Sequence, residues 1–188
     1  TTMALYMMVN SAVRHDWKWI VYSSENRTAS IKMRLMEFVA DCPIADMSQE
    51  MRTNAFKWVS EHFTVIGNES VYSYRDLIVF AEKLIHMNGK HQGFFIDPYN
   101  SLKIQMSPGS SNSTHDYHYE AASEFLTFAN RNDMAVWLNT HAVTEAQRRK
   151  GQDGLPIAPY AEDTEGGGKF VNRADCFLTF HRKVQSPE

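Results

Sequence analysis

Short apolar runs alternate along the chain with longer stretches in which apolar residues recur at helical spacing. The apolar runs lack period-two alternation, which is typical of strands covered on both faces of a parallel sheet. We predict strands at residues 17–22, 63–66, 93–97, 134–139 and 175–180. We predict helices at residues 3–13, 28–39, 48–62, 73–89 and 117–131, and a loop at 107–113. Strands separated by helices predict an α/β fold with a doubly wound, mostly parallel twisted sheet flanked by helices.

Chemically active residues follow four of the predicted strands. They are Glu25, Asp97, His141 and Arg182. Because the carboxyl ends of parallel strands share one edge of the sheet, where ligands of such sheets bind, we expect the four at one site. Each also has an ordinary explanation: Glu25 can cap the next helix and Asp97 a turn. His141 can be a core histidine, and Arg182 a surface cation.

Composition narrows the classes of function. At 188 residues, the chain is long enough for one domain with its own core. Its net charge of -3 gives no overall attraction to nucleic acid, so such binding needs a local basic patch. Arg148, Arg149 and Lys150 form a cluster of this kind, although charge clusters are usually only solvated.

The remaining composition indicates a soluble intracellular protein. Cys42 and Cys176 lie far apart and fit no metal-binding spacing, so we expect reduced thiols and a cytoplasmic location. No apolar run reaches membrane-spanning length, and residues 1–13 lack the pattern of a signal peptide. We therefore expect no membrane partner.

A triphosphate site at this sheet edge also needs a glycine-rich phosphate loop, and the chain contains no G-x-x-x-x-G-K-[ST]. Thr1 and Thr2 are followed by sequence typical of the middle of a helix. If a longer natural chain were cut just after the loop lysine, Thr1 would supply the Mg²⁺-ligating hydroxyl. We therefore expect a domain at 1–188 that is truncated at its phosphate loop, and poor nucleotide binding by this fragment.

With the phosphate loop supplied, the sequence resembles the RecA-like P-loop ATPase domain of hexameric replicative helicases of the DnaB and Twinkle type, in bacteriophage-like forms. The resemblance covers essentially all 188 residues. Residues 20–25 are similar to the strand whose last glutamate activates the attacking water. Residues 94–97 resemble the Walker B strand, and residues 136–141 the strand whose last residue senses the γ-phosphate.

Residues 166–182 resemble the last helicase motif, whose final arginine reaches into the ATP site of the neighbouring subunit. Arg182 takes that position, with Lys183 as the alternative, because His-Arg-Lys stands where the family commonly has Tyr-Arg-Asp. The sequence departs from the family a second time at Asp97, which is followed by Pro-Tyr rather than by Tyr-Leu.

The resemblance implies an enzyme that hydrolyses ATP with Mg²⁺ and couples this to movement on single-stranded DNA as a homo-oligomer, a hexamer in the full-length protein. It implies that Glu25 activates water, His141 senses the γ-phosphate and Arg182 is the finger. It places Thr1, Thr2 and Asp97 at the nucleotide, with Thr1 and Asp97 on the metal. It places Arg148, Arg149 and Lys150 on DNA.

Two alternatives stay open. One is a RecA- or RadA-like recombinase or regulatory ATPase, and the other is a non-catalytic, degenerate RecA-like module for binding or assembly. The presence of both Glu25 and Asp97 argues against degeneracy.

Overall fold

The structure is a computed structural model that describes residues 1–105, 114–164 and 166–181. Internal contacts divide the chain into two compact units. The first, here called the sheet unit, comprises Thr1–Lys103 and Phe128–Asn139, and the second, the loop unit, comprises Ile104–Thr127 and Thr140–Glu188. The prediction of one domain over residues 1–188 stays a prediction. The predicted loop at 107–113 lies outside the described residues.

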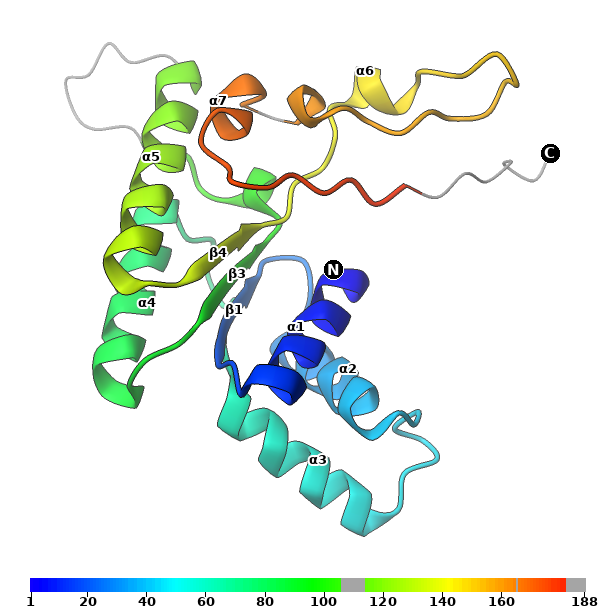
Figure 1. The fold of residues 1–188 in the computed structure, drawn as a ribbon, viewed down its shortest axis with the longest axis vertical. Coiled ribbons are helices and arrows are strands. Elements are labelled where there is room, and N and C mark those ends of the chain that lie inside the picture. Colours follow the sequence, from blue (N-terminus) through cyan, green and yellow to red (C-terminus); the bar gives the residue numbers. More distant parts are fainter. Residues whose placement is uncertain (106–113, 165, 182–188) are drawn as a thin grey trace. The chain divides into compact units, whose positions relative to one another are not determined.

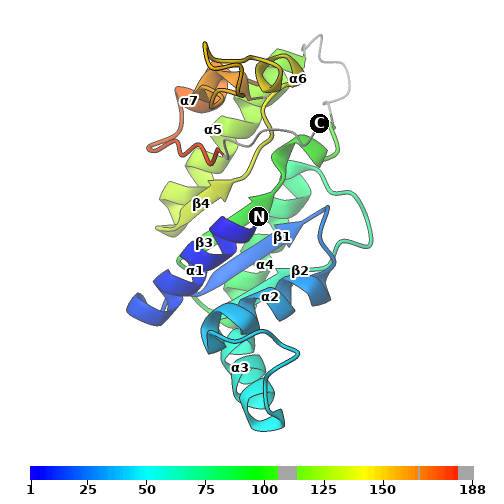
Figure 2. The same cartoon turned by 90° about the vertical axis from the view of Figure 1, so that its right-hand side faces the viewer.

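The sheet unit is built on four parallel strands in the order β2-β1-β3-β4 (Figures 1 and 2). These strands are β1 (Trp19–Ser23), β2 (Phe63–Ile66), β3 (Gly93–Asp97) and β4 (Ala135–Leu138). Every residue of β1 and β3 is buried, which explains why their sequences lack alternation. Trp19 pairs with Gly93 and Ser23 with Asp97, so the two central strands end level with each other.

Helices cover both faces of this sheet. They are α1 (Thr2–His15), α2 (Thr28–Ala40), α3 (Gln49–His62), α4 (Tyr74–Asn88) and the last residues of α5 (Thr114–Asn132). Figure 1 shows α1, α2 and α3 on one face and α4 on the other. All five predicted helices are confirmed. Ser48 and Ser73 begin α3 and α4 as N-caps, and Ser73 forms the predicted capping box with Asp76.

Trp19 is the centre of the core beneath α1, α2 and α3. It is 0% exposed, and its ring lies 4.7 Å from that of Trp137 and 5.8 Å from that of Trp17. Its indole Nε1 donates a 2.9 Å hydrogen bond to Ser11 Oγ on α1. On the opposite face, α5 contributes Phe128 to the core. Both faces of the central strands are therefore apolar up to the point where the strands end.

The loop unit has few regular elements. Besides the start of α5, it contains α6 (Thr144–Gln147), the 3-10 turn η2 (Ala161–Asp163) and α7 (Gly168–Val171). Two isolated bridges join Ala142 with Thr164 and Lys150 with Pro156. No helix of the described residues is long and apolar enough to cross a membrane.

The predicted strand at residues 175–180 is wrong. These residues are described and form no strand. Phe177, Leu178 and Phe180 are 37%, 60% and 61% exposed. The Thr179 hydroxyl donates a hydrogen bond to Pro159 O at 3.4 Å. This is a side-chain contact and not one of the backbone hydrogen bonds that pair two strands. The apolar composition predicted burial, but a strand also needs a neighbour for its backbone, and composition says nothing about that neighbour.

Candidate functional site

Asp97 ends β3 with a side chain that is almost completely buried. The residue is 1% exposed, and both of its carboxylate oxygens accept hydrogen bonds from the ends of neighbouring strands. Ser23, the last residue of β1, donates its hydroxyl to Oδ2 at 3.3 Å. Asn139, directly after β4, donates its side-chain amide to Oδ1. Strand register thus brings three side chains together at the carboxyl edge.

Thr1 meets the same carboxylate from the start of α1. Its hydroxyl donates to Asp97 Oδ2 at 2.5 Å. Thr1 is the N-cap of α1 but makes no side-chain bond to the helix amides. The amides of the first turn of α1 therefore receive no acceptor from their own cap, in the arrangement that favours anions at helix starts.

The turn after β1 adds a fourth neutral donor to the site. The Asn26 side-chain amide lies 3.3 Å from Asp97 Oδ2, 3.1 Å from Ser23 Oγ and 3.5 Å from Thr1 Oγ1. The backbone holds this turn in place, since Ser24 N donates to Asp97 O at 3.0 Å.

The donor set around Asp97 fits Mg²⁺. Within the described residues, no lysine, arginine or histidine forms an ion pair with Asp97, so the buried carboxylate has only neutral partners. A buried carboxylate without a cation is costly, and a divalent ion would remove that cost. Mg²⁺ prefers oxygen ligands and usually takes only one or two from protein, which the adjacent Thr1 hydroxyl and Asp97 carboxylate supply.

No larger metal-binding cluster competes with this arrangement in the described part of the chain. No group of three or more His, Cys, Asp or Glu side chains there could hold a metal ion. An ion at Asp97 would therefore take most of its ligands from water and from a bound phosphate, as Mg²⁺ does at triphosphate sites.

Comparison with known proteins identifies the fold. No protein-family model matches the chain. The chain is 26% identical over 187 residues to Twinkle homolog protein, chloroplastic/mitochondrial, from Arabidopsis thaliana. This match covers 94% of the chain and 25% of that protein. A solved structure described as an ATPase domain superposes with a TM-score of 0.68 at 16% identity, over 93% of this chain and 62% of that one. The fold is a RecA-like ATPase fold.

A second solved structure agrees. A DnaB-like replicative helicase, studied with its primase interactions, superposes with a TM-score of 0.69 at 14% identity, over 93% of this chain and 42% of that one. The chain thus spans about a quarter of the curated relative and less than two thirds of either solved chain. The predicted RecA-like fold and the resemblance to DnaB- and Twinkle-type proteins are confirmed.

Four of the predicted site residues lie at or beside the carboxyl edge of this RecA-like sheet. Thr1 and Asp97 are in direct contact. Glu25 lies two residues beyond the end of β1, in the turn that holds Asn26, and its side chain is exposed. Thr2 is the first residue of α1 and is also exposed. Their roles in binding or catalysis stay predictions.

The other predicted catalytic residues belong to the loop unit. His141 follows Asn139 by two residues and has an exposed side chain. Arg182 and its alternative, Lys183, lie outside the described residues. The sensor and finger roles stay predictions.

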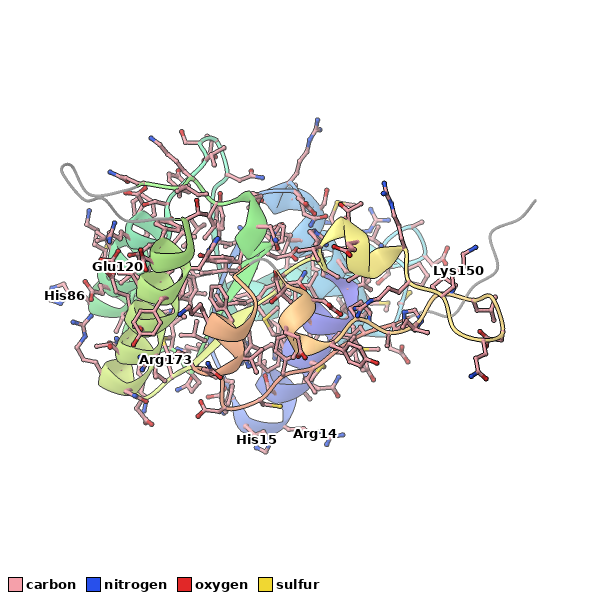
Figure 3. The ribbon with its side chains drawn as sticks, turned by 90° about the horizontal axis from the view of Figure 1, so that it is seen from above. Arg14, His15, His86, Glu120, Lys150 and Arg173 are labelled. Carbon is pink, nitrogen blue, oxygen red and sulfur yellow. The ribbon has the colours of Figure 1, made fainter. Side chains whose placement is uncertain are left out.

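The three predicted DNA-binding residues differ in their surroundings. Arg149 forms an ion pair with Asp163, and its guanidinium lies 5.1 Å over the ring of Tyr160. The ion pair therefore joins the two ends of the segment 149–163. Asp163 also accepts a 2.6 Å hydrogen bond from Tyr160 N. Arg148 and Lys150 are exposed, and Lys150 is labelled in Figure 3. The DNA-binding role of all three stays a prediction, but among the described residues Arg149 has an acidic partner that the other two lack.

Sequence reasoning missed Ser23, Asn26 and Asn139 as parts of the site. All three stand at or just after a predicted strand end, which is the signal that identified Asp97. Neutral side chains are also typical of turns at these positions, and nothing in their chemistry distinguishes a carboxylate partner from a turn residue.

Proposed function

We propose that this chain is the motor domain of a replicative DNA helicase, which hydrolyses ATP with Mg²⁺ and couples this to movement on single-stranded DNA. The contact of the Thr1 hydroxyl with buried Asp97 carries the proposal. It places a hydroxyl, a carboxylate and the start of a 14-residue helix at one sheet edge, where triphosphates bind in such folds. The names of the similar structures, an ATPase domain and a replicative helicase, support the same function.

The residues of the edge have distinct tasks in this proposal. Thr1 and Asp97 would hold Mg²⁺, which when bound neutralises charge on the phosphoryl oxygens. Ser23 and Asn139 fix the Asp97 carboxylate by one hydrogen bond to each oxygen, so that its orientation does not change during turnover. Glu25 would accept a hydrogen bond from the attacking water and orient it.

The remaining tasks belong to the loop unit and to other subunits. His141 would bond the γ-phosphate, and Arg182 would enter the site of a neighbouring subunit. An arginine acting in a neighbour requires a closed assembly, and we propose a homo-hexamer. Arg148, Arg149 and Lys150 would contact phosphates of single-stranded DNA without reading sequence. We place the protein in the cytoplasm of a bacterium or of a phage-infected cell.

The test is ATP turnover by the full-length protein with and without single-stranded DNA. Glu25→Gln should retain binding of a fluorescent ATP analogue but lose about a hundredfold or more in DNA-stimulated turnover. Asp97→Asn should weaken the dependence of nucleotide binding on Mg²⁺. The matched control is Asp133→Asn, which removes an exposed carboxylate paired with Lys90 at 2.6 Å.

Three outcomes decide among the alternatives. Turnover by Glu25→Gln at the wild-type rate would overturn the catalytic assignment. ATP hydrolysis without separation of a forked duplex would favour a recombinase or regulatory ATPase. Absence of nucleotide binding by the full-length wild type would favour the non-catalytic module.

A further inference from the structure

A half-exposed aromatic ring in the loop unit is flanked by two cations. Tyr119 of α5 is 44% exposed. Lys169 Nζ lies 5.2 Å and Arg173 Cζ 4.8 Å from the centroid of its ring. Arg173, labelled in Figure 3, also donates a hydrogen bond to the Tyr119 hydroxyl. We call Tyr119, Lys169 and Arg173 the Tyr119 patch.

Glycine and a buried histidine build this patch. Gly166 has a φ of +80°, and a Cβ there would lie 2.9 Å from the Phe170 ring and 3.0 Å from the His118 side chain. His118 is 5% exposed, and its ring centroid is 6.3 Å from that of Phe170. Glycine at position 166 therefore lets α7 pack closely against α5. This packing places Lys169 beside Tyr119, the residue that follows His118 in α5.

The two cations of the patch have no acidic partner in the described residues. Their contacts are with the tyrosine ring and its hydroxyl. Arg149, in contrast, pairs with Asp163 in the same unit. Two positive charges at one ring repel each other. An anion bound between or beside them would attract both, and this attraction would offset their repulsion.

The combination of charge and ring identifies the anion. A free phosphate would use only the two cations and would make no use of the exposed part of the Tyr119 side chain. Single-stranded nucleic acid uses both, because its phosphates pair with cations and its unstacked bases stack on aromatic side chains. In a duplex the base faces are covered by neighbouring bases, so a tyrosine ring cannot stack on them without opening the duplex.

We propose that the Tyr119 patch is a binding site for single-stranded DNA, with a phosphate at Lys169 and Arg173 and a base on Tyr119. This rests on the proposed function, which supplies the partner. Arg149, which is paired with Asp163, also holds the segment 149–163. The Tyr119 patch adds the charges of Lys169 and Arg173 to the proposed DNA contacts of Arg148, Arg149 and Lys150.

The proposal is tested by fluorescence anisotropy of labelled oligo(dT) with the full chain. Lys169→Gln with Arg173→Gln should weaken binding about tenfold at 0.1 M salt, and should lower the slope of log affinity against log salt by about one to two. Tyr119→Leu should weaken binding by a similar factor with a smaller change in slope. Lys83→Gln, an exposed lysine of α4 in the sheet unit, is the matched control and should leave both quantities unchanged.

A second measurement does not depend on the stability of the variants. Oligo(dT) carrying 5-iodouracil should photo-cross-link to wild-type protein at Tyr119, identified by mass spectrometry of the peptide. Melting of each variant by circular dichroism shows whether it is folded. Wild-type affinity in both variants, together with no cross-link at Tyr119, would overturn the proposal.

Further outcomes separate this proposal from the proposed function. If the wild type binds oligo(dT) and hydrolyses ATP but the variants bind normally, only the Tyr119 patch fails. If the wild type binds no DNA, the helicase function itself fails. Equal competition by tripolyphosphate or by duplex of the same length would contradict base stacking on Tyr119.

Discussion

The sheet unit and the loop unit present their polar side chains in different ways. In the sheet unit, Ser23, Asp97 and Asn139 are placed by the register of buried parallel strands. In the loop unit, Arg149 is placed by side-chain contacts with Asp163 and Tyr160, and Arg173 by contacts with Tyr119. A ladder of backbone bonds defines position cooperatively, whereas a loop depends on each contact separately. Chemistry that needs fixed oxygens is therefore built on the sheet, and contacts to a flexible polymer can be built on the loop unit.

The sharpest way to break this comparison is one methyl group added to a glycine in each unit. A Cβ at Gly93 would lie 2.2 Å from the ring of Trp19, which is 0% exposed and paired with Gly93 across the central strands. We expect Gly93→Ala to lower the free energy of unfolding by about 3 kcal/mol. Gly168→Ala, where a Cβ meets nothing within 4 Å, should change it by less than about 1 kcal/mol. Guanidinium unfolding measures both.

If the two variants lost similar amounts of unfolding free energy, the two units would not differ in how tightly they are packed around these glycines. A loss confined to Gly93→Ala would show that the central strands tolerate no added volume.

The sequence predicted the sheet unit better because burial leaves a signal in the pattern of apolar residues, either an unbroken apolar run or helical spacing. The fully apolar run before Asp97 predicted β3 and its polar end. Helical spacing predicted α2 to α4, and the pair Ser73 and Asp76 predicted where α4 begins. The partners of Asp97 could be expected only as strand ends, since register is a property of three strands together and not of any one of them.

Most of the loop unit could not be predicted in this way. Phe177 and Leu178 carry a strand-like pattern but lie in an exposed segment, because a strand requires a partner that the local sequence does not encode. Arg149 and Asp163 lie 14 positions apart in a segment with few regular elements, so no periodicity relates them. Tyr119 lies in a helix, as the sequence predicts, but nothing in its neighbours indicates two cations from beyond residue 165.

Removing one contact of the loop unit sharpens the comparison at a smaller scale. Asp163→Ala removes the partner of Arg149 and the acceptor of Tyr160 N. Because both side chains are partly buried, we expect about 1 to 2 kcal/mol of local stability to be lost. Hydrogen exchange of residues 150–163 should quicken about fivefold to thirtyfold while β1 and β3 stay protected. Arg148→Gln, at an exposed neighbour, is the control. Unchanged exchange in Asp163→Ala would show that the pair does not hold this segment.

The smallest expected effect is a pH dependence that arises in the sheet unit. His91 is 3% exposed, and burial lowers its pKa, with Lys18 adding to the shift, although a 2.9 Å contact with Gly89 O opposes it. The unfolded chain therefore takes up this proton first as the pH falls below about 6.5. Stability from neutral His91 is complete above that pH and declines below it, until the folded form is also protonated.

We expect this proton to cost the wild type up to about 1 kcal/mol between pH 7 and pH 5.5, measured by urea unfolding. His91→Gln should flatten the decline, because glutamine does not titrate. His86→Gln, at an exposed histidine of α4 labelled in Figure 3, should keep the wild-type slope. Hydrogen exchange, corrected for the intrinsic effect of pH, should place the loss in the strands around His91 and not in residues 150–163. If His91→Gln shows the same decline in unfolding free energy as the wild type, the decline comes from other titrating groups. Protonation of His91 would then not be what first destabilises the sheet unit as the pH falls.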